Sequence, residues 1–205
     1  YRGASTHYHP EDITLEGVEA DWLYVTTMAG SMKVLNRLFS QAKAAGMKIC
    51  FNPGKRELAK PEELRGLLED VDVLLANKGE MQQMFQGDDL IELVLHALNV
   101  VPVVLATDGG NGVAASDGKT LIRAGRYEDG KVVDQTGAGD AFGSGFLSQW
   151  AMGKSLRESI IFASANSLSV VGKMGAKTGI LHRGVRLHEM PLHEQPLERR
   201  GEHGA

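Results

Sequence analysis

Short apolar runs of strand length alternate along this chain with segments of helical periodicity. Four such runs are WLYVTT at 22–27, KICFN at 48–52, VDVLLAN at 71–77 and VPVVLAT at 101–107. The last two are almost wholly apolar, which is typical of parallel strands that are covered on both faces. Alternating strands and helices with such strands predict an α/β fold: a three-layer α/β/α, doubly wound, mostly parallel sheet with right-handed crossovers.

The intervening segments carry helix and turn signals. Between the first two runs, apolar residues recur at spacings of three and four and end before Gly46, as in an amphipathic helix with a glycine C-cap. Asp117-Gly118 lies between two short runs and predicts a β-hairpin. We expect helices at 79–85, 88–99, 140–152 and 155–172. Residues 1–182 are predicted to form one domain, and the polar residues 183–205 a flexible C-terminal tail.

Composition excludes several classes of function. The chain has 205 residues, 22 Lys and Arg, 26 Asp and Glu, a formal charge of -4 and a pI of about 6.0. It therefore has no basic field for nucleic acid or an anionic membrane, and no apolar run approaches the ~18 residues of a membrane helix. The lone Cys50 cannot form an internal disulfide and indicates a reducing, cytoplasmic setting. Scattered histidines in a polar tail do not predict a metal site.

The spacing of the glycine-rich motifs distinguishes between kinds of phosphate-binding loop. A P-loop needs a glycine separated by four residues from Gly-Lys-Ser/Thr, but Ser148 precedes Gly153 and Val113 precedes Gly118 at that distance. Gly137-Ala138-Gly139 imitates a dinucleotide fingerprint, yet a second helix follows where a strand ending in an acid is required. The glycines at 137–139 are therefore better explained as an anion hole at a helix N-terminus, which consecutive N–H groups and the helix dipole create.

The full segment around these glycines resembles the signature of the ribokinase-like, or PfkB, family of carbohydrate kinases. It reads Asp134-Gln135-Thr136-Gly137-Ala138-Gly139-Asp140-Ala141-Phe142. The resemblance implies that Gly137, Ala138 and Gly139 hold the transferred phosphoryl group and that Asp140 is the catalytic base toward a hydroxyl attacking ATP. The alternative is that Asp140 only caps an ordinary helix.

Two further motifs agree with the family pattern. Asn77-Lys78-Gly79-Glu80 is similar to the Asn-x-x-Glu element, which implies that Asn77 and Glu80 help to hold Mg²⁺ through water. A plain capping box explains the same residues, and both readings can hold together. The turn with Thr107, Gly109 and Gly112 resembles the Thr-x-Gly-x-x-Gly element beside the nucleotide, with a hairpin-entry turn as the alternative.

The resemblance assigns roles to residues later in the chain. Asn166 and Gly175 lie in segments similar to the element that borders the adenine, and Asn166 is expected to face the base. A helix-surface Asn is the alternative. Asp134 and Thr136 match positions that bind a monovalent cation such as K⁺ in many members, although Gln135 departs from the usual Thr.

The resemblance covers residues 1 to about 182 but only the later two thirds of a family member. The first strands, the small β-lid and most sugar-binding side chains are expected outside this chain. The implied function is ATP-dependent phosphoryl transfer to a hydroxyl of a small sugar. A nucleoside kinase of the same family and a nucleotide-binding module without turnover are the alternatives. The resemblance does not tell which acceptor is used, whether this chain alone is active, or whether a full-length member forms a homodimer.

Overall fold

The computed structural model describes residues 8–127, 130–182 and 184–197. The chain divides into two compact units, Tyr1–Thr107 and Asp108–Ala205, and each is described by itself. The predicted domain of residues 1–182 thus extends across both units. Within the described residues, no helix combines the length and the hydropathy that crossing a membrane requires.

The first unit contains four strands that all run parallel. They are β1 (Trp22–Val25), β2 (Lys48–Phe51), β3 (Val73–Asn77) and β4 (Val103–Thr107). They lie in the order β1-β2-β3-β4, with Val25 opposite Phe51 and Asn77 opposite Thr107. Val73 to Ala76 and Val103 to Ala106 are buried, as their apolar sequences predicted. Because the strands are parallel, their carboxyl ends share one edge of the sheet.

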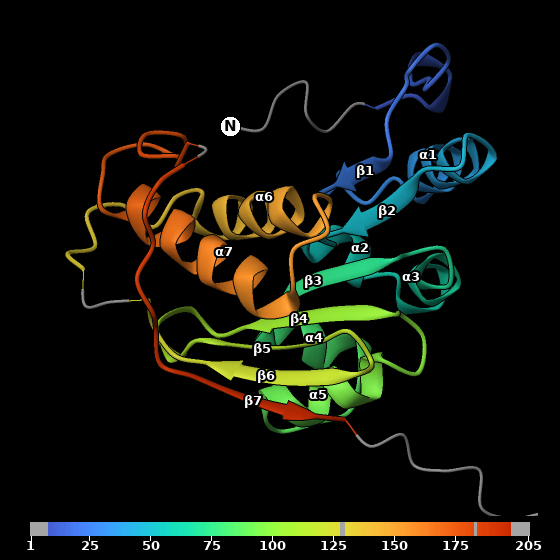
Figure 1. The fold of residues 1–205 in the computed structure, drawn as a ribbon. Coiled ribbons are helices and arrows are strands. Elements are labelled where there is room, and N and C mark those ends of the chain that lie inside the picture. Colours follow the sequence, from blue (N-terminus) through green and yellow to red (C-terminus); the bar gives the residue numbers. More distant parts are fainter. Residues whose placement is uncertain (1–7, 128–129, 183, 198–205) are drawn as a thin grey trace, which may run out of the picture. The chain divides into compact units, whose positions relative to one another are not determined.

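Helices connect these strands. The connecting helices are α1 (Met32–Ala44), α2 (Lys55–Leu58), α3 (Pro61–Leu68), α4 (Lys78–Met84) and α5 (Leu90–Ala97), and the 3-10 helix η2 (Pro10–Asp12) precedes β1. The apolar stripe of α1 is buried as predicted, and Phe39 meets Phe51 of β2 edge to face, with ring centroids 5.3 Å apart. Figure 1 shows α1 and α3 side by side. Because parallel strands are normally joined by right-handed crossovers, the sequential strand order leads us to expect the connecting helices on one face of this sheet.

The second unit begins with a short 3-10 helix and contains three antiparallel strands. These elements are η3 (Gly109–Asn111), β5 (Val113–Ser116), β6 (Thr120–Ala124) and β7 (Leu192–Pro196). The predicted hairpin is confirmed: Ser116 pairs with Leu121, and Gly118 adopts a φ of 77° in the turn. Within the predicted flexible tail, residues 192–196 form strand β7, which pairs with β6 along its whole length. Residues 183 and 198–205 lie outside the described residues.

Two long helices complete the second unit, α6 (Ala138–Trp150) and α7 (Leu156–Val171). They lie side by side (Figure 1). A Cβ on Gly145 would come within 3.2 Å of Ala163 Cα, so the missing side chain lets the two backbones approach closely. Asn166 is 2% exposed and links the helices, because its Nδ2 donates to the Ala141 carbonyl at 2.7 Å.

Candidate active site

The N-terminus of α6 is the best candidate for phosphate binding in the second unit. Gly137 is its N-cap, with a φ of 84°, and no side chain caps this helix. The Ala138 N–H bonds to the Gln135 carbonyl, whereas the N–H groups of Gly139 and Asp140 have no partner among the described residues of this unit. By contrast, side chains of Asn77, Asp89 and Ser155 cap α4, α5 and α7. The first turn of α6 therefore presents open donors at the positive end of a helix dipole.

The two glycines of this turn have different surroundings. A Cβ on Gly137 would lie 2.6 Å from the Ala176 carbonyl oxygen, so this position requires glycine for both its φ and its packing. A Cβ on Gly139 would meet nothing within 4 Å. Open space in front of Gly139 is what a phosphate needs to reach the backbone amides.

Asp140 follows directly in the first turn of α6. Its side chain is exposed, and within the described residues of its unit the carboxylate takes part in no hydrogen bond or ion pair. It does not cap the helix, since Gly137 holds the N-cap position. A carboxylate that is exposed and unpaired beside open amides is accessible to a hydroxyl group that has to lose its proton.

Asp134 joins two of the predicted segments. Its Oδ1 accepts the Thr136 N–H at 2.9 Å, and its Oδ2 accepts the Gly175 N–H at 3.0 Å. These hydrogen bonds, those of Thr136 first, lower the pKa of the Asp134 carboxyl. Ser167 adds a further link by donating from Oγ to the Ala138 carbonyl at 3.0 Å. The loop before α6 and the segment after α7 are thus fixed to each other at the start of α6.

Asn166 is placed differently from the prediction. Its Oδ1 accepts the Leu181 N–H at 2.8 Å, and its Nδ2 donates to Ala141, so the buried amide is bonded to protein groups. Because both amide atoms are bonded to protein groups in the interior, Asn166 is not a helix-surface residue, and it is not part of the nucleotide-binding set proposed below. Gly175 donates its N–H to Asp134 and contributes to the site through that contact.

The Gly-rich turn divides between the two units. Thr107 ends β4 in the first unit, whereas in the second unit Gly109 begins η3 and Gly112 is its C-cap. Gly112 has a φ of 100°, and a Cβ there would overlap the Ala124 carbonyl oxygen. Gly109 has a φ of 49° and open space around it. Gly112 is therefore needed for the hairpin entry itself, and Gly109 leaves the backbone accessible.

In the first unit, Asn77 and Glu80 form a reciprocal capping box at the start of α4. Asn77 Oδ1 accepts the Glu80 N–H at 3.0 Å, and Glu80 Oε2 accepts the Asn77 N–H at 2.9 Å. Burial raises the pKa of Glu80, while the Asn77 bonds and the nearby Lys55 charge oppose that rise. Glu80 Oε1 takes part in none of these bonds, so the carboxylate keeps an oxygen for a cation or its water shell. The pair fits Mg²⁺, which needs one or two carboxylates beside phosphate oxygens.

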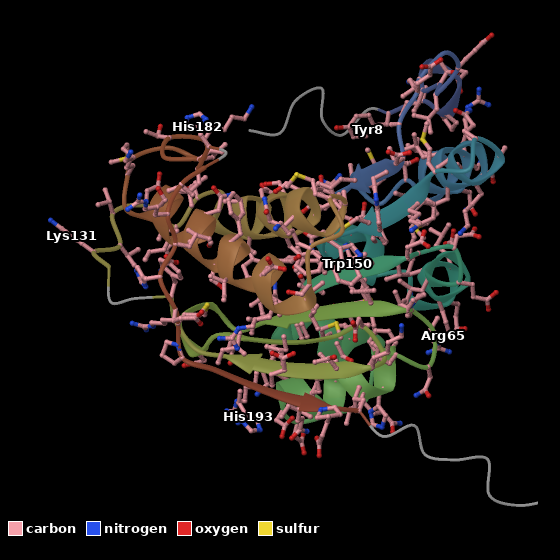
Figure 2. All side chains as sticks on the ribbon, in the orientation of Figure 1. Tyr8, Arg65, Lys131, Trp150, His182 and His193 are labelled. Atoms are coloured by element: carbon pink, nitrogen blue, oxygen red, sulfur yellow. The ribbon has the colours of Figure 1, made fainter. Side chains whose placement is uncertain are left out.

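Two histidines of the second unit, His182 and His193, lie apart from each other. His182 and His193 are at separate places in Figure 2, in the segment after α7 and on β7. Among the residues that the structure describes, no group of three or more His, Cys, Asp or Glu side chains could hold a metal ion.

A cavity of about 620 Å³ lies beside the second half of α7. Its lining includes Tyr127, Lys131, Leu168, Lys173 and His188. None of the predicted site residues is among its lining residues.

Comparison with known proteins identifies the family. The model of the pfkB family carbohydrate kinases matches residues 2–183. The chain belongs to this family. A cytidine kinase of Thermococcus kodakarensis is 30% identical over 149 residues, which are 70% of this chain and 52% of that protein. A ribokinase of Lactococcus lactis is 31% identical over 138 residues, 67% of this chain and 43% of that protein.

A solved structure shares the fold. An E. coli protein assigned as ribokinase II, in complex with ATP and Mg²⁺, matches with a TM-score of 0.70 and 21% identity, over 86% of this chain and 59% of that one. The predicted ribokinase-like α/β fold with a mostly parallel sheet is confirmed. The chain spans about half the length of these two curated relatives.

Proposed function

We propose that this pfkB-family protein transfers the γ-phosphoryl group of ATP to a hydroxyl group of a small sugar. The observation that carries the proposal is the uncapped first turn of α6. Among the described residues of its unit, the N–H groups of Gly139 and Asp140 and the adjoining Asp140 carboxylate have no partner. Phosphoryl transfer requires mainly positioning and charge stabilisation, which such a turn can supply.

In the proposed reaction, the acceptor oxygen attacks the γ-phosphorus and the bond from that phosphorus to the bridging oxygen of ADP breaks. Asp140 accepts the proton that the acceptor hydroxyl loses. The amides at 139 and 140 stabilise the negative charge on the oxygens of the migrating group. Gly137 and Ala138 give the turn its shape, and Asp134 fixes it to the segment at Gly175.

Asn77 and Glu80 are proposed to hold Mg²⁺ through water. Bound Mg²⁺ would neutralise charge on the β- and γ-phosphates. The capping box keeps the Glu80 carboxylate in a fixed orientation, because Oε2 is bonded to the Asn77 N–H and Oε1 remains available. Thr107, Gly109 and Gly112 are proposed to contact the nucleotide through their exposed or half-exposed backbone.

We also propose, from the family resemblance, that Asp134 and Thr136 bind a monovalent cation. Each Asp134 oxygen already accepts one N–H, from Thr136 or Gly175, and a carboxylate oxygen has a second lone pair for a cation. We further propose that the protein works in the cytoplasm, where ATP is abundant and an unpaired thiol such as Cys50 persists.

A nucleoside is the second candidate acceptor. The cytidine kinase of T. kodakarensis is as similar to this chain as the ribokinase of L. lactis, at 30% and 31% identity. Both acceptor classes offer a hydroxyl on a five-membered sugar, so the chemistry at Asp140 is the same for both.

Acceptor-dependent release of ADP by the natural full-length protein tests the proposal. The assay contains ATP and Mg²⁺ and a panel of ribose, fructose, adenosine and cytidine, with the Asp140→Ala variant as control. We expect at least one acceptor to accelerate ADP release in the wild type and none to do so in the variant. ATP binding without acceptor-dependent release across the panel would instead indicate a nucleotide-binding module without turnover.

A further inference from the structure

One buried carboxylate joins two turns at the carboxyl edge of the first unit's sheet. Glu57, in the short helix α2, is 0% exposed. Its Oε1 accepts the N–H groups of Met28 at 2.8 Å and Gly30 at 2.7 Å. Its Oε2 accepts the Gly54 N–H at 3.1 Å and the Thr27 hydroxyl at 2.8 Å. All four donors lie in the turns that follow β1 and β2, so this carboxylate holds both turns together.

The two turns also pack closely against each other. A Cβ on Gly54 would lie 2.7 Å from Thr27 Cβ, and a Cβ on Gly30 would lie 2.8 Å from Arg56 Cβ. Ala29 adopts a φ of 55°, which is unfavourable for a residue with a side chain and persists only where the surroundings fix the backbone. The turn after β1 is therefore held in one conformation by contacts with α2.

This arrangement fixes the direction in which the Thr27 hydroxyl donates its hydrogen bond. Its side chain is exposed, and its hydroxyl proton is donated to Glu57. A hydroxyl has one proton and two lone pairs, so the Thr27 oxygen remains free to accept a hydrogen bond from an incoming O–H group. A protein hydroxyl oriented as an acceptor in this way suits an alcohol as the ligand.

Thr27 lies just beyond the carboxyl end of β1, where a bound acceptor could contact it. Ligands of open parallel sheets bind beyond the carboxyl ends of the strands. Asn77 and Thr107, which the proposed function gives to the magnesium and the nucleotide, end β3 and β4, whereas Thr27 follows β1. Strands lie about 4.8 Å apart, so the ends of β1 and β3 are separated by about 10 Å, the scale of one sugar molecule.

We propose that Thr27 binds a hydroxyl group of the acceptor and that Glu57 is the positioning residue that orients Thr27. The inference rests on the proposed function for the identity of the ligand as a polyhydroxy compound. It adds a specificity contact: a sugar or nucleoside that lacks the contacted hydroxyl should bind less well than one that carries it.

The first experiment compares Thr27→Val with Thr27→Ser in the natural full-length protein. Valine keeps the shape of an exposed side chain and removes only the hydroxyl. The loss of one hydrogen bond should raise the acceptor KM about 3- to 10-fold, with the KM for ATP changed by less than about twofold. Thr27→Ser keeps the hydroxyl and should restore most of the acceptor affinity. An acceptor KM that Thr27→Val leaves unchanged overturns the inference.

The second experiment separates positioning by Glu57 from a purely structural role. Glu57→Gln replaces one acceptor oxygen by an NH₂ group, which would face an N–H or O–H donor. Asp72→Asn is the matched control. Asp72 Oδ2 also accepts a backbone N–H, that of Ile49 at 2.8 Å, but at the amino end of β2, away from the proposed acceptor site. Both variants should lower stability, but only Glu57→Gln should raise the acceptor KM relative to the KM for ATP. Equal effects of the two variants on acceptor KM overturn the role of Glu57.

The failure of this inference can be distinguished from the failure of the proposed function. Wild-type turnover that Asp140→Ala abolishes, together with normal acceptor KM values in Thr27→Val and Glu57→Gln, overturns this inference alone. Absence of acceptor-dependent ADP release in the wild type overturns the proposed function and this inference with it.

Discussion

Asp134 shows how one half-buried carboxylate can organise a site. It bonds to the N–H groups of Thr136, two residues on, and of Gly175, 41 residues on. These donors favour the ionised form and lower its pKa. A carboxyl group whose pKa is lower in the folded than in the unfolded state stabilises the fold above the unfolded pKa. That stabilisation is lost as the pH falls through the folded pKa.

The Asp134→Asn variant tests this linkage. The amide cannot ionise, so the variant should be less stable than the wild type at pH 7. The difference in stability should shrink as the pH falls below the ordinary Asp pKa of about 3.9. The wild-type carboxyl then becomes protonated, first in the unfolded and at lower pH in the folded state, and loses its charge. Urea unfolding at a series of pH values measures this difference in stability between the wild type and the variant. A difference that does not vary with pH would show that the ionised state of Asp134 contributes nothing to the fold.

Two residues show where prediction from the sequence stops. Asn166 lies in a helix whose buried residues spread around it, so periodicity could not tell which face an amide occupies. Glu57 lies in the polar run KREL, which is typical of a solvated surface. Its burial depends on donors about 30 residues earlier, in the turn after β1, which no local pattern reveals.

At the scale of the element, the first turn of α6 combines a structural and a functional requirement. Gly137 needs its left-handed φ and has no room for a Cβ beside Ala176. Gly139 has helical geometry and open space, so the fold itself does not require glycine there. A glycine that the fold does not need, at a turn with open amides, is consistent with close approach by a phosphate.

The variants Gly139→Ala and Gly137→Ala form a matched pair. Alanine at 139 should leave stability unchanged or raise it by about 0.5–1 kcal/mol, since glycine is unfavourable within a helix, and should lower phosphoryl transfer by obstructing the amides. Alanine at 137 should lower stability as well as activity. Thermal unfolding and ADP release measure the two effects. Full activity in Gly139→Ala would contradict a phosphate contact at this turn.

Most elements could be predicted because their signals are local. The four parallel strands, the hairpin at Asp117-Gly118 and the helix ending before Gly46 all carry apolar patterns or turn residues of their own. Strand β7 could not be predicted, since LHEQP is polar and mostly exposed. Its backbone pairing with β6 forms it, and an exposed edge strand needs no apolar face.

At the scale of the whole molecule, the predicted site residues fall in both units. Asn77, Glu80 and Thr107 belong to the first, and the segment from Asp134 to Asp140 belongs to the second. The family could be expected from the sequence because its resemblance rests on one continuous segment, Asp134 to Phe142. The proposed acceptor contact at Thr27 could not be predicted, because it is inferred from tertiary hydrogen bonds.

The most direct test of the central claim is kcat and ATP affinity of Asp140→Asn in the natural full-length protein. Asparagine keeps the shape of the side chain but cannot take the acceptor proton. We predict that kcat falls about 10²- to 10⁴-fold while the Kd for ATP changes by less than about threefold. A variant that retains kcat within about tenfold of the wild type would contradict the assignment of Asp140 as the base.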